Sequence, residues 1–140
     1  MPGEVVCVTS MNVTPPQPLI AVVDDEESVR RALARLIRTG SFDVEIFASG
    51  GEFLESLQGR RPDCVVLDVH MPGLTGRDVQ RQLRRAQIQM PLIVVTAQDA
   101  PALREQCLAD GAYAYLAKSE VGVRLINLIR DAINLRTAAP

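Results

Sequence analysis

Acidic side chains directly follow two short apolar runs in this sequence of 140 residues. Asp24 and Asp25 come after the run 19–23, and Asp68 comes after the run 64–67. Carboxylates gathered in one place repel one another, and a divalent cation relieves that repulsion. Mg2+ takes a few carboxylates, keeps several waters and completes its shell with phosphoryl oxygen. Because an aspartate can also act as a nucleophile and become an acyl phosphate, these residues suit chemistry on a phosphoryl group.

Two further polar side chains follow apolar runs and could bind phosphoryl oxygens. Thr96 follows the run 92–95, and Lys118 comes shortly after the run 112–116. A lysine ammonium supplies a positive charge, and a threonine hydroxyl supplies a hydrogen-bond donor. Such groups stabilise the charge-spread transition state of phosphoryl transfer by position and electrostatics. Each residue alone also fits an ordinary loop or cap position, but polar residues after four separate apolar runs together favour one site.

A regular alternation of apolar runs and amphipathic segments would position these residues. We expect strands at 19–23, 44–47, 63–68, 91–96 and 112–116. We expect helices through the apolar positions Val29, Leu33, Leu36 and Ile37, after Ser49, after Thr75, after Asp99, and from about 119 to about 136. This alternation predicts one α/β domain with a parallel sheet and helices on both faces. The carboxyl ends of its strands share one edge, so the polar residues should meet there.

Three of the helix starts carry capping signals. Ser49 and Thr75 each begin a capping box, with an acidic residue three positions later. Asp99 precedes a proline that suits the first helical turn, so we expect Asp99 to cap the helix that follows.

Composition and charge are those of an ordinary globular domain. The chain is 47% hydrophobic with a net charge of -2, which gives no global argument for nucleic-acid binding. Cys7, Cys64 and Cys107 lack zinc spacing with the single histidine, and reduced thiols fit best. No apolar run approaches the roughly 18 residues of a membrane span, and no signal peptide is recognisable. We therefore expect a cytoplasmic protein without a membrane partner.

Four motifs make the chain resemble the receiver domains of bacterial two-component response regulators. They are Val22–Glu26, Leu67–Gly76, Val95–Ala97 and Gly111–Lys118. Over residues 24–54 the resemblance is closest to receivers joined to helix-turn-helix transcription regulators of the nitrogen-fixation and nitrate-response type. It implies a flavodoxin-like, five-stranded (βα)5 fold. It also divides the chain into a tail at 1–17, a receiver domain at 18–137 and a C-terminal end or linker at 138–140, without an output domain.

The resemblance implies a phosphoacceptor and a metal site. Asp68 would accept the phosphoryl group. Mg2+ would be held by Asp24, Asp25, Asp68 and the backbone carbonyl of His70. The family also uses the position of His70 to tune how long the phosphate lasts, with an exposed loop histidine as the equal alternative.

The resemblance further implies an anion contact and a switch. Lys118 would contact the phosphoryl group, and Thr96 would move to bind it. Tyr115 would rotate inward into the space that Thr96 vacates. Ala97 is small and would leave the approach to the acceptor open.

One residue departs from the family's pattern. The family usually follows the lysine with a proline in a cis peptide, whereas Ser119 stands here. A cis bond without proline costs about 3–4 kcal/mol. This cost favours a trans Lys118–Ser119 bond with Ser119 capping the last helix, and it leaves the reach of Lys118 open.

The function implied is a signalling switch and not an enzyme. A sensor histidine kinase or a histidine phosphotransfer protein would donate the phosphoryl group. The helix at 99–109, the strand with Tyr115 and the last helix would form a phosphorylation-dependent homodimer, unless the wide apolar face of the last helix only fills the core. DNA would be reached only through an output domain. The alternatives are a stand-alone receiver acting through protein contacts, and an aspartyl-nucleophile phosphatase, which is disfavoured because His70 replaces that class's general-acid aspartate.

Overall fold

The structure is a computed structural model and describes residues 16–138. Its elements in chain order are β1 (Leu19–Val23), α2 (Glu27–Arg38), β2 (Asp43–Phe47), α3 (Gly50–Ser56), β3 (Cys64–Leu67), α4 (Gly76–Arg85), β4 (Leu92–Thr96), α5 (Pro101–Ala109), β5 (Ala114–Ala117), the 3-10 turn η1 (Lys118–Glu120) and α6 (Val123–Ala138). Within residues 16–138, no helix is long and apolar enough to cross a membrane. Most of the tail predicted at 1–17, and residues 139–140, lie outside the described residues.

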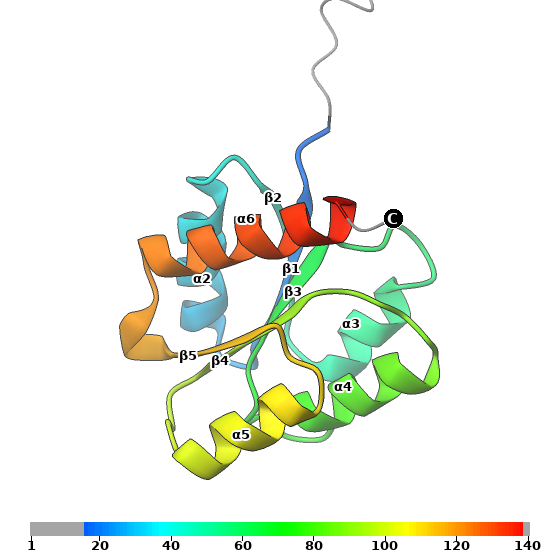
Figure 1. Cartoon of the computed structure of the whole chain (residues 1–140), viewed down its shortest axis with the longest axis vertical. Coiled ribbons are helices and arrows are strands. Elements are labelled where there is room, and N and C mark those ends of the chain that lie inside the picture. The colour runs from blue at the N-terminus through cyan, green and yellow to red at the C-terminus, as the bar shows by residue number, and fades with distance from the viewer. Residues whose placement is uncertain (1–15, 139–140) are drawn as a thin grey trace, which may run out of the picture.

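The five strands form one parallel sheet in the order β2-β1-β3-β4-β5. Helices α2 and α6 cover one face, and α3, α4 and α5 cover the other (Figure 1). This arrangement confirms the predicted α/β sheet with helices on both faces. Strand β3 follows β2 in the chain but pairs with β1, so the carboxyl ends of β1 and β3 lie side by side in the sheet.

Two apolar cores lie on the two faces of the sheet, and alternate strand residues supply them. In β1, Val23 packs with α3 and α4, whereas Val22 packs with α2 and α6. Every residue of β1, β3 and β4 is buried. Strands buried on both faces read as continuous apolar runs, which is why these three were recognisable in the sequence.

Two predicted helix starts are wrong for local reasons. Helix α5 begins at Pro101, and its N-cap position is held by Ala100, without a side-chain cap, instead of by Asp99. Proline drives the residue before it into an extended conformation, so the residue outside the helix has to be Ala100. Ser119 does not cap α6, because it lies within η1 and α6 begins at Val123. The capping box at Thr75 is confirmed, and at Ser49 the side chain caps α3 by accepting from the Glu52 N–H, without a reciprocal bond from Glu52 among the described contacts.

Candidate functional site

The ends of β1 and β3 bring the three predicted acidic residues together. Val23 pairs with Leu67, so Asp24 and Asp68 follow on adjacent strands. The ladder continues past the strands, since the Asp68 N–H donates to the Val23 carbonyl at 3.0 Å. Asp24 and Asp68 are buried and Asp25 is exposed, and one carboxylate oxygen from each lies within 4.8 Å of the others. The edge of the sheet therefore concentrates negative charge at a partly buried place.

Lys118 reaches these carboxylates from β5. Its Nζ lies 3.0 Å from Asp24 Oδ2 and 3.7 Å from Asp68 Oδ2. No cis peptide bond occurs among the described residues, so the Lys118–Ser119 bond is trans. The lysine thus reaches both acids without the proline that the family pattern places after it.

The turn that carries Lys118 is held by Glu120, which the sequence analysis did not select. The Glu120 carboxylate accepts a hydrogen bond from the Ala117 N–H at 3.1 Å and pairs with Arg124 at 2.8 Å. No signal in the sequence indicated this contact, because a capping box begins with Ser or Thr and position 117 is alanine.

Arg30 is a second residue that the sequence analysis missed. Its Nη1 donates to the Asp24 backbone carbonyl at 2.8 Å from the second turn of α2. The Asp24 side chain is held as well, because its Oδ1 accepts from the Glu26 N–H at 2.9 Å. An arginine on a helix is ordinarily part of a solvated polar face, so its residue type alone gave no signal for this contact. Asp24 is therefore fixed at both its main chain and its side chain.

A close approach between α4 and the end of β3 fixes the backbone of Asp68. The Gly76 N–H donates to the Val69 carbonyl at 3.0 Å. A Cβ at position 76 would lie 2.6 Å from the Asp68 carbonyl oxygen and 2.8 Å from Val69 Cα. Only glycine fits at this approach, so the first residue of α4 determines how Asp68 is presented.

Burial and charge shift the protonation of the site. Burial raises the pKa of the Asp68 carboxyl above its ordinary value, and the Asp24 charge raises it further. The His70 N–H, which donates to Asp68 Oδ1 at 3.2 Å, and the Lys118 charge oppose this shift. For Lys118 burial acts to lower the pKa, but the nearby Asp24 and Asp68 carboxylates outweigh it and the net shift is upward. The ammonium is therefore retained at neutral pH.

Thr96 is the last residue of β4, and Tyr115 lies on the adjacent strand β5. Thr96 is fully buried, and its Oγ1 accepts from the Gln98 N–H at 3.2 Å. The Tyr115 ring already points inward, with the Arg104 guanidinium 6.0 Å from its centroid. Its buried hydroxyl lies near Asp99 and has no hydrogen-bond partner within residues 16–138, and burial raises the pKa of this hydroxyl. The aromatic residue predicted to rotate inward is thus inside the fold in this structure.

The remaining predicted residues lie at the open side of the site. His70 and Ala97 are both exposed. Ala97 follows Thr96 directly and His70 lies two residues after Asp68. At these positions neither residue blocks the access of a large molecule to this edge of the sheet.

The donor set fits a small divalent cation. Hard cations such as Mg2+ bind carboxylate and carbonyl oxygens and water. Asp24 Oδ2 is buried, accepts no hydrogen bond, and has only the ion pair with Lys118 among the described residues. The exposed Asp25 carboxylate adds a third oxygen from the solvent side. These residues can therefore hold Mg2+.

The sheet order and the acidic edge with its lysine define a flavodoxin-like α/β domain whose site lies at the carboxyl ends of its strands. Residues 20–130 match the response regulator receiver domain. The chain belongs to this family, which confirms the resemblance predicted from the four motifs.

Relatives and solved structures agree with this assignment. The response regulator MprA of Mycobacterium sp. (strain KMS) is 43% identical over 99 residues, which cover 71% of this chain and 43% of that protein. The chain therefore spans less than half the length of the curated relatives it matches. The crystal structure of FixJ-N aligns with a TM-score of 0.78 at 27% identity, over 87% of this chain and 96% of that one. The response regulator StyR aligns with a TM-score of 0.76 at 34% identity, over 86% and 61% of the two chains.

Proposed function

We propose that this receiver domain is a phosphorylation switch in which Asp68 is the phosphoacceptor. The observation that carries the proposal is the position of the Asp68 carboxylate, which lies beside Asp24 and Asp25 with Lys118 Nζ 3.7 Å away. The donor is a phosphohistidine of a sensor histidine kinase or a histidine phosphotransfer protein. An Asp68 oxygen attacks phosphorus and forms a P–O bond. The P–N bond breaks, and its electron pair stays with the imidazole, which leaves as neutral histidine because its other ring nitrogen carries a proton; the product is an acyl phosphate.

The residues around Asp68 have separate tasks in this reaction. Asp24, Asp25, Asp68 and the His70 backbone carbonyl would hold Mg2+, which would supply positive charge to offset the carboxylates and the phosphoryl group. Lys118 moves its ammonium from the carboxylates onto another phosphoryl oxygen. This movement is short, because Lys118 Nζ already lies within 4 Å of an Asp68 oxygen.

The switch runs from Thr96 through Tyr115 to the face formed by α5, β5 and α6. In the proposed active form the Thr96 hydroxyl donates to the phosphoryl group, and Tyr115 fills the space behind it. Thr96 pairs with Ala117 in the sheet, and Lys118 directly follows Ala117, so both phosphoryl contacts come from the ends of neighbouring strands. A movement of Thr96 in β4 and Tyr115 in β5 would then shift α5 and α6, which form the face where a second copy would bind.

The downstream output is a separate part of the proposal. The resemblance of residues 24–54 to receivers of helix-turn-helix regulators supports a cytoplasmic regulator of transcription that reaches DNA through a further domain. A stand-alone receiver that acts by protein contacts is the alternative. No observation favours the phosphatase, since the exposed His70 stands where that class has its general-acid aspartate.

Chemical mapping tests the acceptor directly. The protein is incubated with phosphoramidate and Mg2+, and sodium borohydride then reduces the acyl phosphate. Peptide sequencing should find homoserine at position 68. Homoserine at another aspartate, or phosphate on a side chain that borohydride does not reduce, would overturn the assignment.

A further inference from the structure

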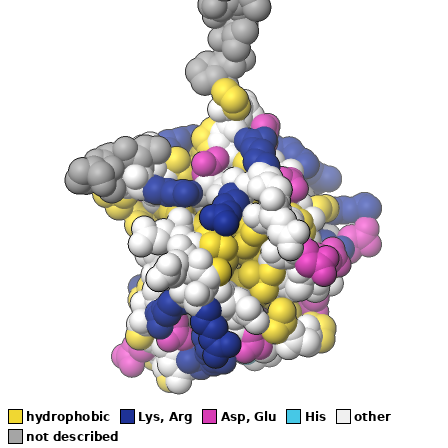
Figure 2. Space-filling model, turned by 90° about the vertical axis from the view of Figure 1, so that its right-hand side faces the viewer, with side chains coloured by type: hydrophobic (Ala, Val, Ile, Leu, Met, Phe, Trp, Pro, Cys, Tyr) yellow, Lys and Arg dark blue, Asp and Glu magenta, His cyan; other side chains and the backbone are white. Residues whose placement is uncertain are grey.

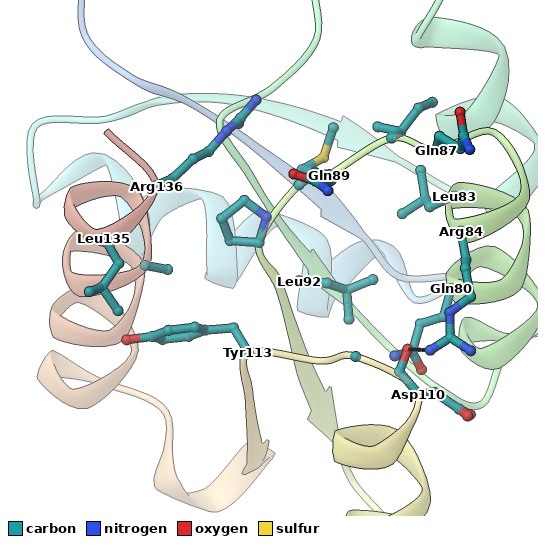
Figure 3. A pocket seen from close by; sticks show the side chains of 15 residues that line it. Gln80, Leu83, Arg84, Gln87, Gln89, Leu92, Asp110, Tyr113, Leu135 and Arg136 are labelled. Carbon is teal, nitrogen blue, oxygen red and sulfur yellow. Dashed lines mark hydrogen bonds between the residues drawn. The ribbon is translucent and has the colours of Figure 1, made fainter. Parts of the chain in front are cut away.

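A groove of about 930 Å³ lies at the end of the sheet opposite to the acidic site. The last turn of α4, with Leu83 and Arg84, forms one wall, and the end of α6, with Leu135 and Arg136, forms the other (Figure 3). Leu92 at the start of β4 lies between them. The groove shares no residue with the acidic site, and the proposed function does not use it.

The groove exposes apolar side chains that a folded domain normally covers. Leu135 is 61% exposed and Tyr113 is 37% exposed, and both line it. Ile88 and Met90 line it as well and are only partly buried. The face shown in Figure 2 has apolar side chains at its centre, with Lys or Arg side chains above and below them. A contiguous apolar surface of this kind indicates a binding partner.

The charges around the groove favour an occupant with an acidic group. Arg84 and Arg136 lie on its two walls. Asp110 is the only acidic residue in the lining, and it is occupied by an ion pair with Arg77 at 3.0 Å. The groove therefore suits an apolar segment that carries a carboxylate.

The N-terminal chain enters the described part of the protein at this same end of the sheet. The Gln17 carbonyl accepts from Arg60 at 3.5 Å, and the Leu19 carbonyl accepts from the Asp63 N–H at 2.7 Å. Arg136, which lines the groove, donates to the Asp63 carbonyl at 3.4 Å. The start of β4 is two strands from β1, a separation of about 10 Å. Fifteen residues reach up to about 50 Å, so residues 1–15 can span this distance.

The composition of residues 1–15 matches the groove. Glu4 is the only charged side chain in this segment, and the apolar run 5–8 follows it directly. Valines favour an extended backbone, in which a short segment can reach along the groove between the two helix ends. We propose that residues 4–13 of this chain occupy the groove, with the apolar run against Met90, Tyr113 and Leu135 and with Glu4 beside an arginine of the wall.

A spin label on Cys7 tests this proposal in the full chain. Cys64 and Cys107 are both 0% exposed, so a thiol-specific nitroxide reacts with Cys7 in the folded protein. The label should broaden the NMR amide signals of Gln87, Tyr113 and Leu135, and reduction of the nitroxide should restore them. Signals of Asp24 and Asp68 should stay sharp, because they lie at the other end of the sheet.

Charge variants supply the control. Arg84→Gln together with Arg136→Gln should weaken the broadening, whereas Arg85→Gln, an exposed neighbour that does not line the groove, should leave it unchanged. Circular dichroism checks that each variant is folded. Broadening spread evenly over the surface, or concentrated at β2, would overturn the proposal. So would equal broadening when labelled and isotope-enriched copies are separate molecules, since the occupant would then be another copy.

Discussion

Lys118 is shared by two carboxylates at unequal distances, 3.0 Å to Asp24 and 3.7 Å to Asp68. Both acids are buried, so each depends on the ammonium to offset the loss of hydration. The shorter contact is made to Asp24 Oδ2, a buried oxygen that accepts no hydrogen bond among the described residues. At the scale of single residues, Lys118 therefore stabilises the buried charge of Asp24 more than that of Asp68, the proposed acceptor, before phosphorylation.

Double-mutant cycles in urea unfolding measure this inequality. Lys118→Met with Asp24→Asn should show a coupling free energy of about 1–3 kcal/mol in the metal-free protein. Lys118→Met with Asp68→Asn should show a smaller one, because the atoms are farther apart. The exposed pair Glu120 and Arg124 serves as the control and should couple by less than about 1 kcal/mol. Equal couplings to Asp24 and Asp68 would contradict the geometry.

Cys64 gives a pH dependence that is independent of the site. Burial raises the pKa of its thiol from 9.0 to about 12. The folded protein therefore keeps this proton while the unfolded chain loses it. The stability from the neutral thiol is complete below pH 9 and is lost as the pH rises from 9 toward 12.

The free energy of unfolding at pH 8 and pH 10 checks this expectation. Wild type should lose about 1 kcal/mol more between these values than Cys64→Val, in which the titrating group is gone. Other groups that titrate in this range are present in both proteins and cancel. Equal losses would mean that the thiolate forms without unfolding.

At the scale of elements, the sequence predicted the parts of the site that depend on strand ends. Each buried strand is a continuous apolar run, so the positions of Asp24, Asp68 and Thr96 after such runs could be recognised in the sequence. Their distances follow from the pairing of β1, β3 and β4, which the alternation of elements implied. The 3-10 turn before α6 was not visible, because it depends on the Glu120 side chain binding the Ala117 backbone. The inward Tyr115 ring was not visible either, because rotamers depend on packing and not on spacing.

The contact between α4 and β3 leads to a prediction about Gly76. A Cβ added at position 76 would lie only 2.6 Å from the Asp68 carbonyl oxygen, so Gly76→Ala has to displace the backbone. We expect this change to lower the free energy of unfolding by about 1–3 kcal/mol and to slow phosphorylation. Urea unfolding and the rate of labelling by phosphoramidate measure the two effects.

Gly51→Ala in α3 is the matched control. A Cβ at Gly51 meets only Ser49 Oγ at 3.9 Å, and alanine is the better helix former. The free energy of unfolding should stay the same or rise by up to about 1 kcal/mol. If Gly76→Ala behaves like this control, the close approach does not position Asp68.

At the scale of the whole molecule, most of the apolar face of α6 belongs to the core. Leu125, Ile126, Ile129 and Ala132 are buried, whereas Val123 is 71% exposed. The apolar face of α6 is therefore wide mainly because most of it packs in the core. On α5, which covers the other face of the sheet, Leu108 is 39% exposed and remains available to a partner.

Sedimentation velocity with beryllofluoride, a mimic of the phosphoryl group, tests the proposed homodimer. Wild type should shift from monomer to dimer when the mimic is added, and Leu108→Gln should not. Ile46→Gln changes an exposed apolar residue on the edge strand β2, away from this face, and should dimerise like wild type. Monomers in both states at high concentration would exclude dimerisation as the output.

The mass of the intact protein after incubation with phosphoramidate and Mg2+ tests the phosphoacceptor most directly. Wild type and Asp63→Asn, which changes an acid at the opposite end of β3, should both gain one phosphoryl group of about 80 Da. Asp68→Asn should gain none, and omission of Mg2+ should reduce labelling of wild type. A gain of about 80 Da in Asp68→Asn equal to that of wild type would contradict the proposal that Asp68 receives the phosphoryl group.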